Sequence, residues 1–121
     1  MLRSAGLPLA LAVWLVSGPA LGQDAVTSPQ WVRKPSAAGL HRLFPRAAWE
    51  AGVSGRAIVE CTVTGEGTLT DCKVVEETPP GYGFGQATIR AAAKFRMRPR
   101  AIDGTAVAGR RVRVPLVWRR G

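Results

Sequence analysis

Two alternating segments joined by a glycine-containing turn constrain the fold of this chain most strongly. In residues 56–63, small or β-branched side chains alternate with Ile58, Glu60 and Thr62, which is typical of a half-buried strand. Residues 69–76 form a second such segment, and the five residues between them include Gly65 and Gly67. Strands joined by so short a connection pair antiparallel, so we predict a hairpin.

The two cysteines of the chain test the register of this hairpin. If Glu66-Gly67 is a two-residue turn, Cys61 lies directly opposite Cys72, and Val63 lies opposite Thr70. Cross-strand neighbours have the separation that a disulfide needs, so a Cys61–Cys72 disulfide is predicted. A one-residue bulge at the turn would place the cysteines on opposite faces and forbid the bond. The alternative is two buried thiols that pack as small apolar groups.

The N-terminus has the layout of a secretory signal. Arg3 precedes the apolar run 7–16, and Ala20 and Gly22 suit a cleavage site before Gln23. We therefore predict a signal peptide over 1–22, with an uncleaved membrane anchor as the alternative, and membrane contact only in that case. Residues 23–42 are expected to be a lead-in segment with Trp31 and Val32 docking on the domain. Export separates the chain from nucleic acid and permits a disulfide.

Three further elements complete the predicted domain, which covers 43–118. Pro45 and Gly52 suit the two ends of a short helix. Apolar residues recur at helical spacing from Tyr82 until Arg98-Pro99 ends the second helix. The last strand, 110–118, contains Pro115 and is therefore expected at a sheet edge. The predicted fold is α+β, a two-layer sandwich with a three-stranded antiparallel sheet covered by two helices, in the order α-β-β-α-β.

Charge and chemistry narrow the function. The net charge is +9, from 17 lysines and arginines against 8 acids. The basic residues gather near the C-terminus, namely Arg90, Lys94, Arg96, Arg98, Arg100, Arg110, Arg111, Arg113, Arg119 and Arg120. This pattern fits either a solvated face or a patch for an acidic partner. One histidine, His41, and two cysteines argue against a zinc site, and His41 has no nucleophile nearby in sequence, so no metal, cofactor or catalytic residue is predicted.

Over 43–118 the chain resembles the C-terminal domain of TonB proteins. The resemblance is carried by Leu43-Phe44-Pro45, Ala47-Ala48, Gly52, Gly55-Arg56-Ala57, Gly67, Val74-Val75, the helix at 85–92, Phe95-Arg96-Met97-Arg98-Pro99, Asp103-Gly104 and the closing strand 112–118. It implies a periplasmic, non-enzymatic domain associated with TonB-dependent transport across the outer membrane. It also implies strand addition of an outer-membrane receptor peptide, or another envelope protein, along the last strand, at Arg110, Arg111, Val112, Arg113 and Val114.

Departures from the family pattern limit this reading. Transducers of the family carry a histidine inside a membrane anchor and a long proline-rich linker, whereas here His41 lies outside the apolar segment. About 20 residues separate that segment from the domain, which is at most roughly 70 Å of extended chain. We therefore expect a free periplasmic single-domain relative. A structural or self-dimerising envelope module without transducer activity is the alternative.

Overall fold

The computed structural model of the chain describes residues 25–26 and 29–120, so the predicted signal peptide lies outside the described residues. The elements are β1 (Ala25–Val26), β2 (Trp31–Arg33), α1 (Ala37–Arg42), α2 (Arg46–Ala51), β3 (Gly55–Val63), β4 (Leu69–Thr78), α3 (Phe84–Ala92), β5 (Arg96–Met97) and β6 (Arg111–Trp118). No helix within these described ranges has the length and apolar character needed to cross a membrane.

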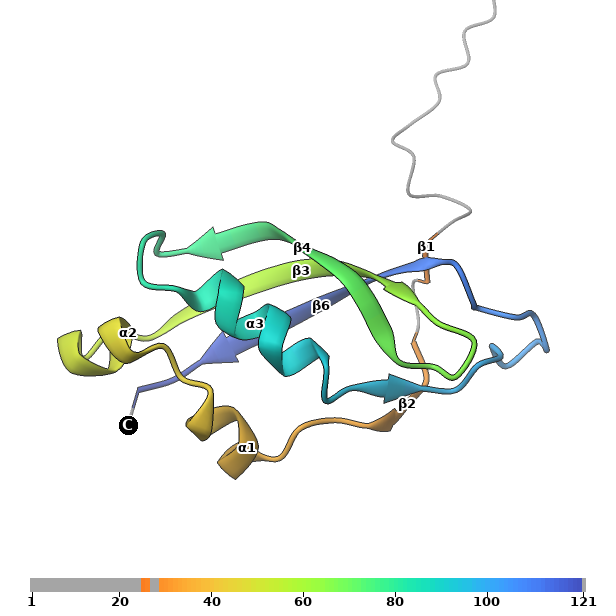
Figure 1. The fold of residues 1–121 in the computed structure, drawn as a ribbon, viewed down its shortest axis with the longest axis horizontal. Helices are drawn as coiled ribbons and strands as arrows, with labels where there is room; N and C mark the ends of the chain where they lie inside the picture. Colours follow the sequence, from red (N-terminus) through yellow and green to blue (C-terminus); the bar gives the residue numbers. More distant parts are fainter. Residues whose placement is uncertain (1–24, 27–28, 121) are drawn as a thin grey trace, which may run out of the picture.

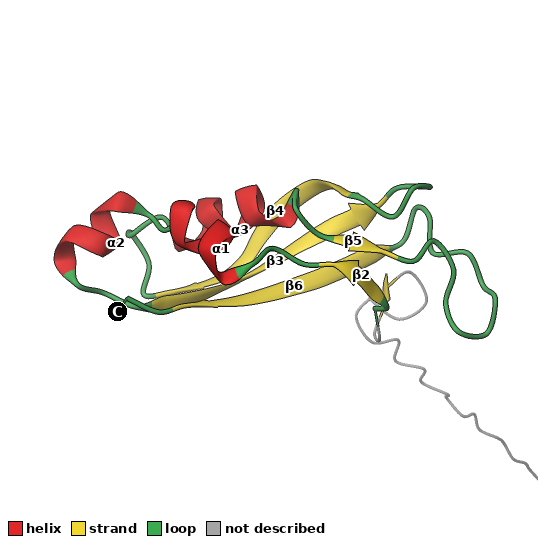
Figure 2. Cartoon of the chain, turned by 90° about the horizontal axis from the view of Figure 1, so that it is seen from below, coloured by secondary structure: helices red, strands yellow, loops and turns green. Residues whose placement is uncertain are grey.

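The main sheet has the strand order β1-β6-β3-β4. Strand β3 is antiparallel to both β4 and β6, and β1 runs parallel to β6. A second, two-stranded sheet pairs β2 with β5. The helices all lie on one side of the main sheet (Figure 2). The α+β class and the two-layer arrangement are therefore confirmed, but three strands and two helices were too few. The lead-in segment contributes β1, β2 and α1, and Arg96–Met97 form β5.

Helix α2 forms where its end signals indicate, but the second predicted helix is shorter than predicted. It ends at Ala92 rather than at Arg98-Pro99, because Arg96–Met97 pair with β2 as strand β5. Helix α2 begins after Pro45 and ends at Gly52, whose φ of 70° is the left-handed conformation that glycine adopts most readily. Helix α3 crosses the sheet and buries one face (Figure 1). The buried residues of that face are Phe84, Gly85, Ala87, Thr88, Ala91 and Ala92.

Alternate residues of β3 and β6 form the floor of the core. One buried cluster contains Val59, Cys61, Val63, Leu69, Ala92, Phe95, Met97, Val107, Val112 and Val114. The other contains Ala48, Ala57, Phe84, Ala87, Ala91 and Trp118. The buried Trp118 indole donates to the Thr88 hydroxyl at 2.9 Å, and this hydroxyl donates to the Phe84 carbonyl at 2.8 Å. Both buried polar groups are therefore satisfied.

The hairpin connection differs from the predicted two-residue turn. Thr64 N–H donates to the Thr68 carbonyl at 2.9 Å, so three residues form the loop, and Gly67 has a φ of 90°. Val63 therefore pairs with Leu69 rather than with Thr70. The predicted turn is therefore wrong by one residue, and the loop has the extra residue at Gly67 that was expected to forbid the disulfide.

A second irregularity brings the cysteines opposite each other despite the longer loop. The register shifts again between Glu60 and Thr62, near Asp71, which has a positive φ of 54°. Glu60 then pairs with Lys73, as the two-residue turn would have required. Cys61 and Cys72 are joined by a disulfide, with their Cα atoms 4.0 Å apart. The predicted disulfide is confirmed, and a bulge in β4 offsets the error in the turn.

The lead-in segment is packed against the domain. The Trp31 ring lies edge-on to Phe95, with ring centroids 4.9 Å apart. The backbone N–H of Arg98 donates to the Gln30 carbonyl at 2.8 Å. The expected docking of Trp31 is confirmed, whereas Val32 is 59% exposed. The segment was expected to lack regular structure because β2 and α1 are too short to give a visible periodicity.

Candidate partner-binding edge

The outer side of β4 and the outer side of β6 beyond its short pairing with β1 differ in regularity. Strand β4 pairs with β3 through two register shifts, and its outer edge carries charged residues such as Asp71 and Lys73. Bulges and charges are features that discourage strand addition. Strand β6 keeps one unbroken register with β3, from Gly55 opposite Trp118 to Thr62 opposite Arg111. The β6 edge is therefore the smoother template for another strand.

The register also shows which backbone groups of β6 point outward. Val63 N–H donates to the Arg110 carbonyl at 2.9 Å. The backbone N–H and carbonyl groups of the even-numbered positions from 110 to 118 therefore point toward β3. The alternate positions, 111 to 117, face the outer edge. Pro115 is one of these, so its missing N–H removes no bond from the β3 ladder. The edge position predicted for the last strand therefore holds only beyond Val112, because β1 pairs with the first part of β6.

Strand β1 occupies the first part of this edge. Ala25 pairs with Arg111 and Val26 pairs with Val112, both in the parallel direction. Beyond Val112, no strand in the described part of the chain pairs with β6 on this side. The outward N–H group of Val117 and the outward carbonyls of residues 113, 115 and 117 form the open stretch, since the parallel pairing of Val26 with Val112 engages the Arg113 N–H. We call residues 113–117 the open edge.

The five residues of the predicted site have different environments. Arg110 lies before β6 and uses both backbone groups within the domain, since its N–H donates to the Val107 carbonyl at 3.0 Å and its carbonyl accepts from Val63. Val112 and Val114 each have 1% exposed surface and pack in the core. Arg111 is half-buried beside β1. Only Arg113 and Val114 fall within the open edge.

The structure adds Pro115 and Val117 to this edge. Both are exposed and lie on the sheet face away from the helices. The alternating pattern of the last strand could have identified Pro115 and Val117. It shows that Val112 and Val114 face the core, which places residues 113, 115 and 117 on the opposite face. The sequence prediction covered Arg110 to Val114 and did not include these two residues.

The Arg113 side chain forms part of a charged cluster across the sheet. Its Nε lies 3.7 Å from Oε2 of Glu60, and Lys73 Nζ lies 3.9 Å from Oε1 of the same carboxylate. The Glu60 side chain is only 8% exposed. The charge of Arg113 is thus partly balanced within the domain, so the open edge presents mainly backbone groups and apolar surface.

A hollow of about 420 Å³ lies beside the open edge. Its walls are Pro29, Trp31, Lys34 and Phe95 on one side and residues 113–116 on the other. A smaller hollow of about 190 Å³ lies near Val117 and Trp118 and includes His41 of α1. The His41 ring packs edge-on against Trp49, with centroids 4.8 Å apart. The two hollows therefore flank the strand edge at its middle and its C-terminal end.

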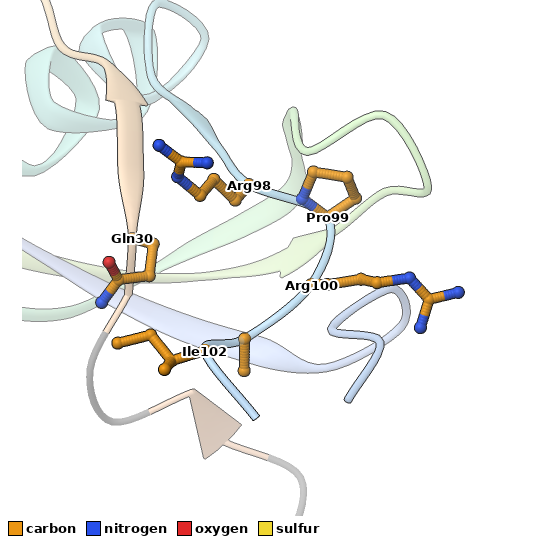
Figure 3. Close-up of a pocket in the computed structure, with 6 residues that line it drawn as sticks. Gln30, Arg98, Pro99, Arg100 and Ile102 are labelled. Atoms are coloured by element: carbon orange, nitrogen blue, oxygen red, sulfur yellow. The ribbon is translucent and has the colours of Figure 1, made fainter. Parts of the chain in front are cut away.

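A further hollow, of about 490 Å³, lies between Gln30 and the loop 98–102 (Figure 3). The Arg100 guanidinium points away from Gln30 and donates through Nη1 to the Gly104 carbonyl at 2.8 Å. Ile102 is 87% exposed at the rim. Within residues 25–26 and 29–120, no group of three His, Cys, Asp or Glu side chains is placed to hold a metal ion.

Sequence comparisons identify the domain. Residues 41–119 match the family described as Gram-negative bacterial TonB protein C-terminal. The chain is 36% identical over 66 residues to Protein TonB of Pseudomonas aeruginosa, which covers 54% of this chain and 19% of that protein. It is 35% identical over 60 residues to an uncharacterized protein of Caulobacter vibrioides, covering 50% of this chain and 60% of the relative. The matched region is thus less than two thirds of either relative.

Solved structures show the same fold. The solution NMR structure of the Pseudomonas aeruginosa TonB C-terminal domain superposes with a TM-score of 0.53 at 24% identity, covering 78% of this chain and 91% of that one. The TonB2 protein of Vibrio anguillarum gives a TM-score of 0.50 at 24% identity, covering 91% of this chain and 99% of that one. Since the family match spans most of the chain, this protein belongs to the family of Gram-negative bacterial TonB C-terminal domains.

Proposed function

We propose that this domain is a non-enzymatic periplasmic module associated with TonB-dependent transport across the outer membrane. In this proposal it captures an extended segment of an outer-membrane receptor or another envelope protein by strand addition along β6. Family membership supports the association with transport. The observation that carries the binding mode is the open edge at residues 113–117, which is regular, outward-facing and flanked by a hollow.

The chemistry of the open edge suits a peptide of mixed sequence. Main-chain hydrogen bonds to Arg113 and Val117 would supply affinity without regard to side chains. Alternate side chains of the added strand would contact the apolar walls formed by Trp31, Phe95 and Leu116 and supply selectivity. Because Glu60 already balances part of the Arg113 charge, we expect selectivity to depend more on apolar side chains than on acidic ones.

Strand β1 indicates how a partner would approach. It uses the same edge in the parallel direction at Arg111 and Val112. A partner strand therefore either pairs beyond Val112 or displaces β1. Deletion of residues 1–28 is expected to extend partner-induced amide shifts to Arg111. Shifts confined to residues 113–117 in both the full and the shortened chain would show that β1 does not limit the site.

The packed lead-in segment bears on the proposed mode of action. Strand β1 holds Ala25 and Val26 against β6, so only residues 23 and 24 lie between the proposed signal peptide and the first paired residue. Two extended residues reach about 7 Å. This is far less than the roughly 70 Å available to an undocked lead-in, and it supports a free periplasmic domain over an inner-membrane transducer.

An NMR titration tests the proposed binding. The exported chain labelled with ¹⁵N is titrated with N-terminal peptides of outer-membrane receptors, and amide shifts at Arg113 and Val117 are expected. The matched variant is Val117→Pro, which removes an outward N–H just as Pro115 does, and it should weaken binding while unfolding at a similar temperature. Shifts elsewhere with none on β6, or unchanged binding by the variant, would contradict strand addition.

Self-association is the alternative occupant of this edge. Two copies of β6 related by a two-fold axis would pair their open edges antiparallel. Light scattering with size-exclusion chromatography distinguishes the two cases, because a dimer that Val117→Pro converts to monomer would assign the edge to self-pairing.

A further inference from the structure

A concave surface between the β2–α1 segment and the end of α3 is lined by basic side chains. It has a volume of about 400 Å³. Figure 1 shows the β2–α1 segment running beside the end of α3. Five cations contribute to the walls, namely Arg33, Lys34, Arg42, Lys94 and Arg96. We call this surface the basic groove.

The basic groove contains no acidic side chain in its lining. All five cations are exposed, and none forms an ion pair with another residue in the ranges 25–26 and 29–120. Of these five side chains, Arg96 alone makes a hydrogen bond to another described residue, from Nε to the Glu66 carbonyl at 3.1 Å. This differs from Arg113, whose guanidinium lies beside the Glu60 carboxylate. The groove therefore concentrates positive charge that the protein does not balance.

The arrangement of the cations favours a ligand with several anionic oxygens. Three of the five are arginines, and one planar guanidinium group can donate two parallel hydrogen bonds to two oxygens of the same phosphate. They come from two walls, with Arg33, Lys34 and Arg42 on one and Lys94 and Arg96 on the other. A single carboxylate has two oxygens and would engage one wall, whereas a phosphate presents oxygens in several directions. Thr68, at the same surface, adds a hydroxyl group.

We propose that the basic groove binds phosphate esters, either as the headgroup of an anionic phospholipid or as a soluble ester. The groove shares Lys34 and Phe95 with the hollow beside the open edge, but it is a different surface with a different ligand class. The proposal does not depend on strand addition at β6.

Paired charge variants test this assignment. The groove variant is Arg42→Gln with Lys94→Gln, and the control is Arg90→Gln with Arg119→Gln, which removes the same charge from exposed positions outside the groove. Thermal unfolding first establishes that both variants fold. Binding is then measured by co-sedimentation with vesicles of phosphatidylglycerol and phosphatidylcholine, against phosphatidylcholine alone, and by amide shifts with glycerol 3-phosphate.

We expect the groove variant to bind about tenfold more weakly, and the control to change by less than about twofold. A selective loss on phosphatidylglycerol vesicles identifies the membrane as the source of the phosphate. Shifts at residues 33–42 and 93–96 with glycerol 3-phosphate, without vesicle binding, identify a soluble ester. Equal losses in both variants would show diffuse charge attraction and overturn the proposal, as would the absence of binding in both assays.

Discussion

Reduction of the Cys61–Cys72 disulfide should lower the free energy of unfolding by about 2–3 kcal/mol. The two cysteines are 11 positions apart in the sequence, so the bond closes a short loop of the unfolded chain. The loop-entropy relation gives about 2.8 kcal/mol at 25 °C for a closed loop of this length. In a domain of this size, each kcal/mol shifts the midpoint temperature by about 4–8 °C. The expected decrease is therefore about 10–20 °C.

The assay compares thermal unfolding of the same protein with and without a thiol reductant, and mass spectrometry confirms reduction. Reductant leaves every side chain in place, so it isolates the cross-link from packing. The variant with Cys61→Ala and Cys72→Ala serves as the control, because its midpoint should not respond to the reductant. A decrease below about 2 °C in fully reduced protein would refute the reasoning.

The same experiment separates stability from binding. Cys61 and Cys72 link β3 to β4, whereas the open edge lies on β6, on the other side of β3. Below the midpoint temperature, reduced protein should therefore keep the amide shifts that a peptide induces at Arg113 and Val117. Loss of those shifts in folded, reduced protein would mean that the edge depends on the hairpin more than the strand order indicates.

Three other predictions concern the core, the turn and an acidic loop. Thr88→Val leaves the buried Trp118 N–H without its acceptor and should cost about 1–3 kcal/mol in urea unfolding, with a smaller loss for Thr88→Ser. Gly67→Ala adds a side chain at a φ of 90° against a neighbouring backbone carbonyl and should cost about 1–3 kcal/mol, whereas Gly65→Ala, in open space, should change stability by less than about 0.5 kcal/mol. The pKa of Asp103 is held below its ordinary 3.8 because the Thr105 backbone N–H donates to the carboxylate. The ionised carboxylate therefore stabilises the fold above its unfolded pKa, and this contribution is lost as the pH falls through the folded pKa. NMR titration should give a midpoint below 3.8, and Asp103→Asn should remove this dependence of stability on acid.

The longer elements follow from local patterns in the sequence. Strands β3, β4 and β6 and helix α3 each have eight or more residues, which is enough for an alternating or helical repeat to appear. Strands β1, β2 and β5 have two or three residues each. They form through tertiary contacts between segments that are distant in the sequence, such as the packing of Trp31 on Phe95. A local sequence pattern does not predict such contacts.

The hairpin shows why a correct contact can follow from an incorrect register. The cysteines were predicted to be opposite on the basis of a two-residue turn. The actual loop is one residue longer, and the bulge near Asp71 restores the pairing before the cysteines are reached. Aspartate tolerates the left-handed conformation better than most residues, so Asp71 was a visible signal. The bulge at Asp71 was not predicted because the residue lies within an alternating pattern that is typical of a regular strand.

A comparison of the open edge with the basic groove explains why net charge alone was a poor guide to the binding edge. Arg113 is on the edge, but Glu60 lies 3.7 Å from its guanidinium, so the residue serves the sheet as well as any partner. Lys34 has no ion pair among the described residues and belongs to both the basic groove and the hollow beside the edge. A chain with a net charge of +9 therefore has basic residues paired with acids on the sheet, such as Arg113 and Lys73, and basic residues without an ion pair among the described residues, including the five of the basic groove. Because the lead-in segment supplies three of the five groove cations, the segment that appears least structured in the sequence contributes most of the charge of the basic groove.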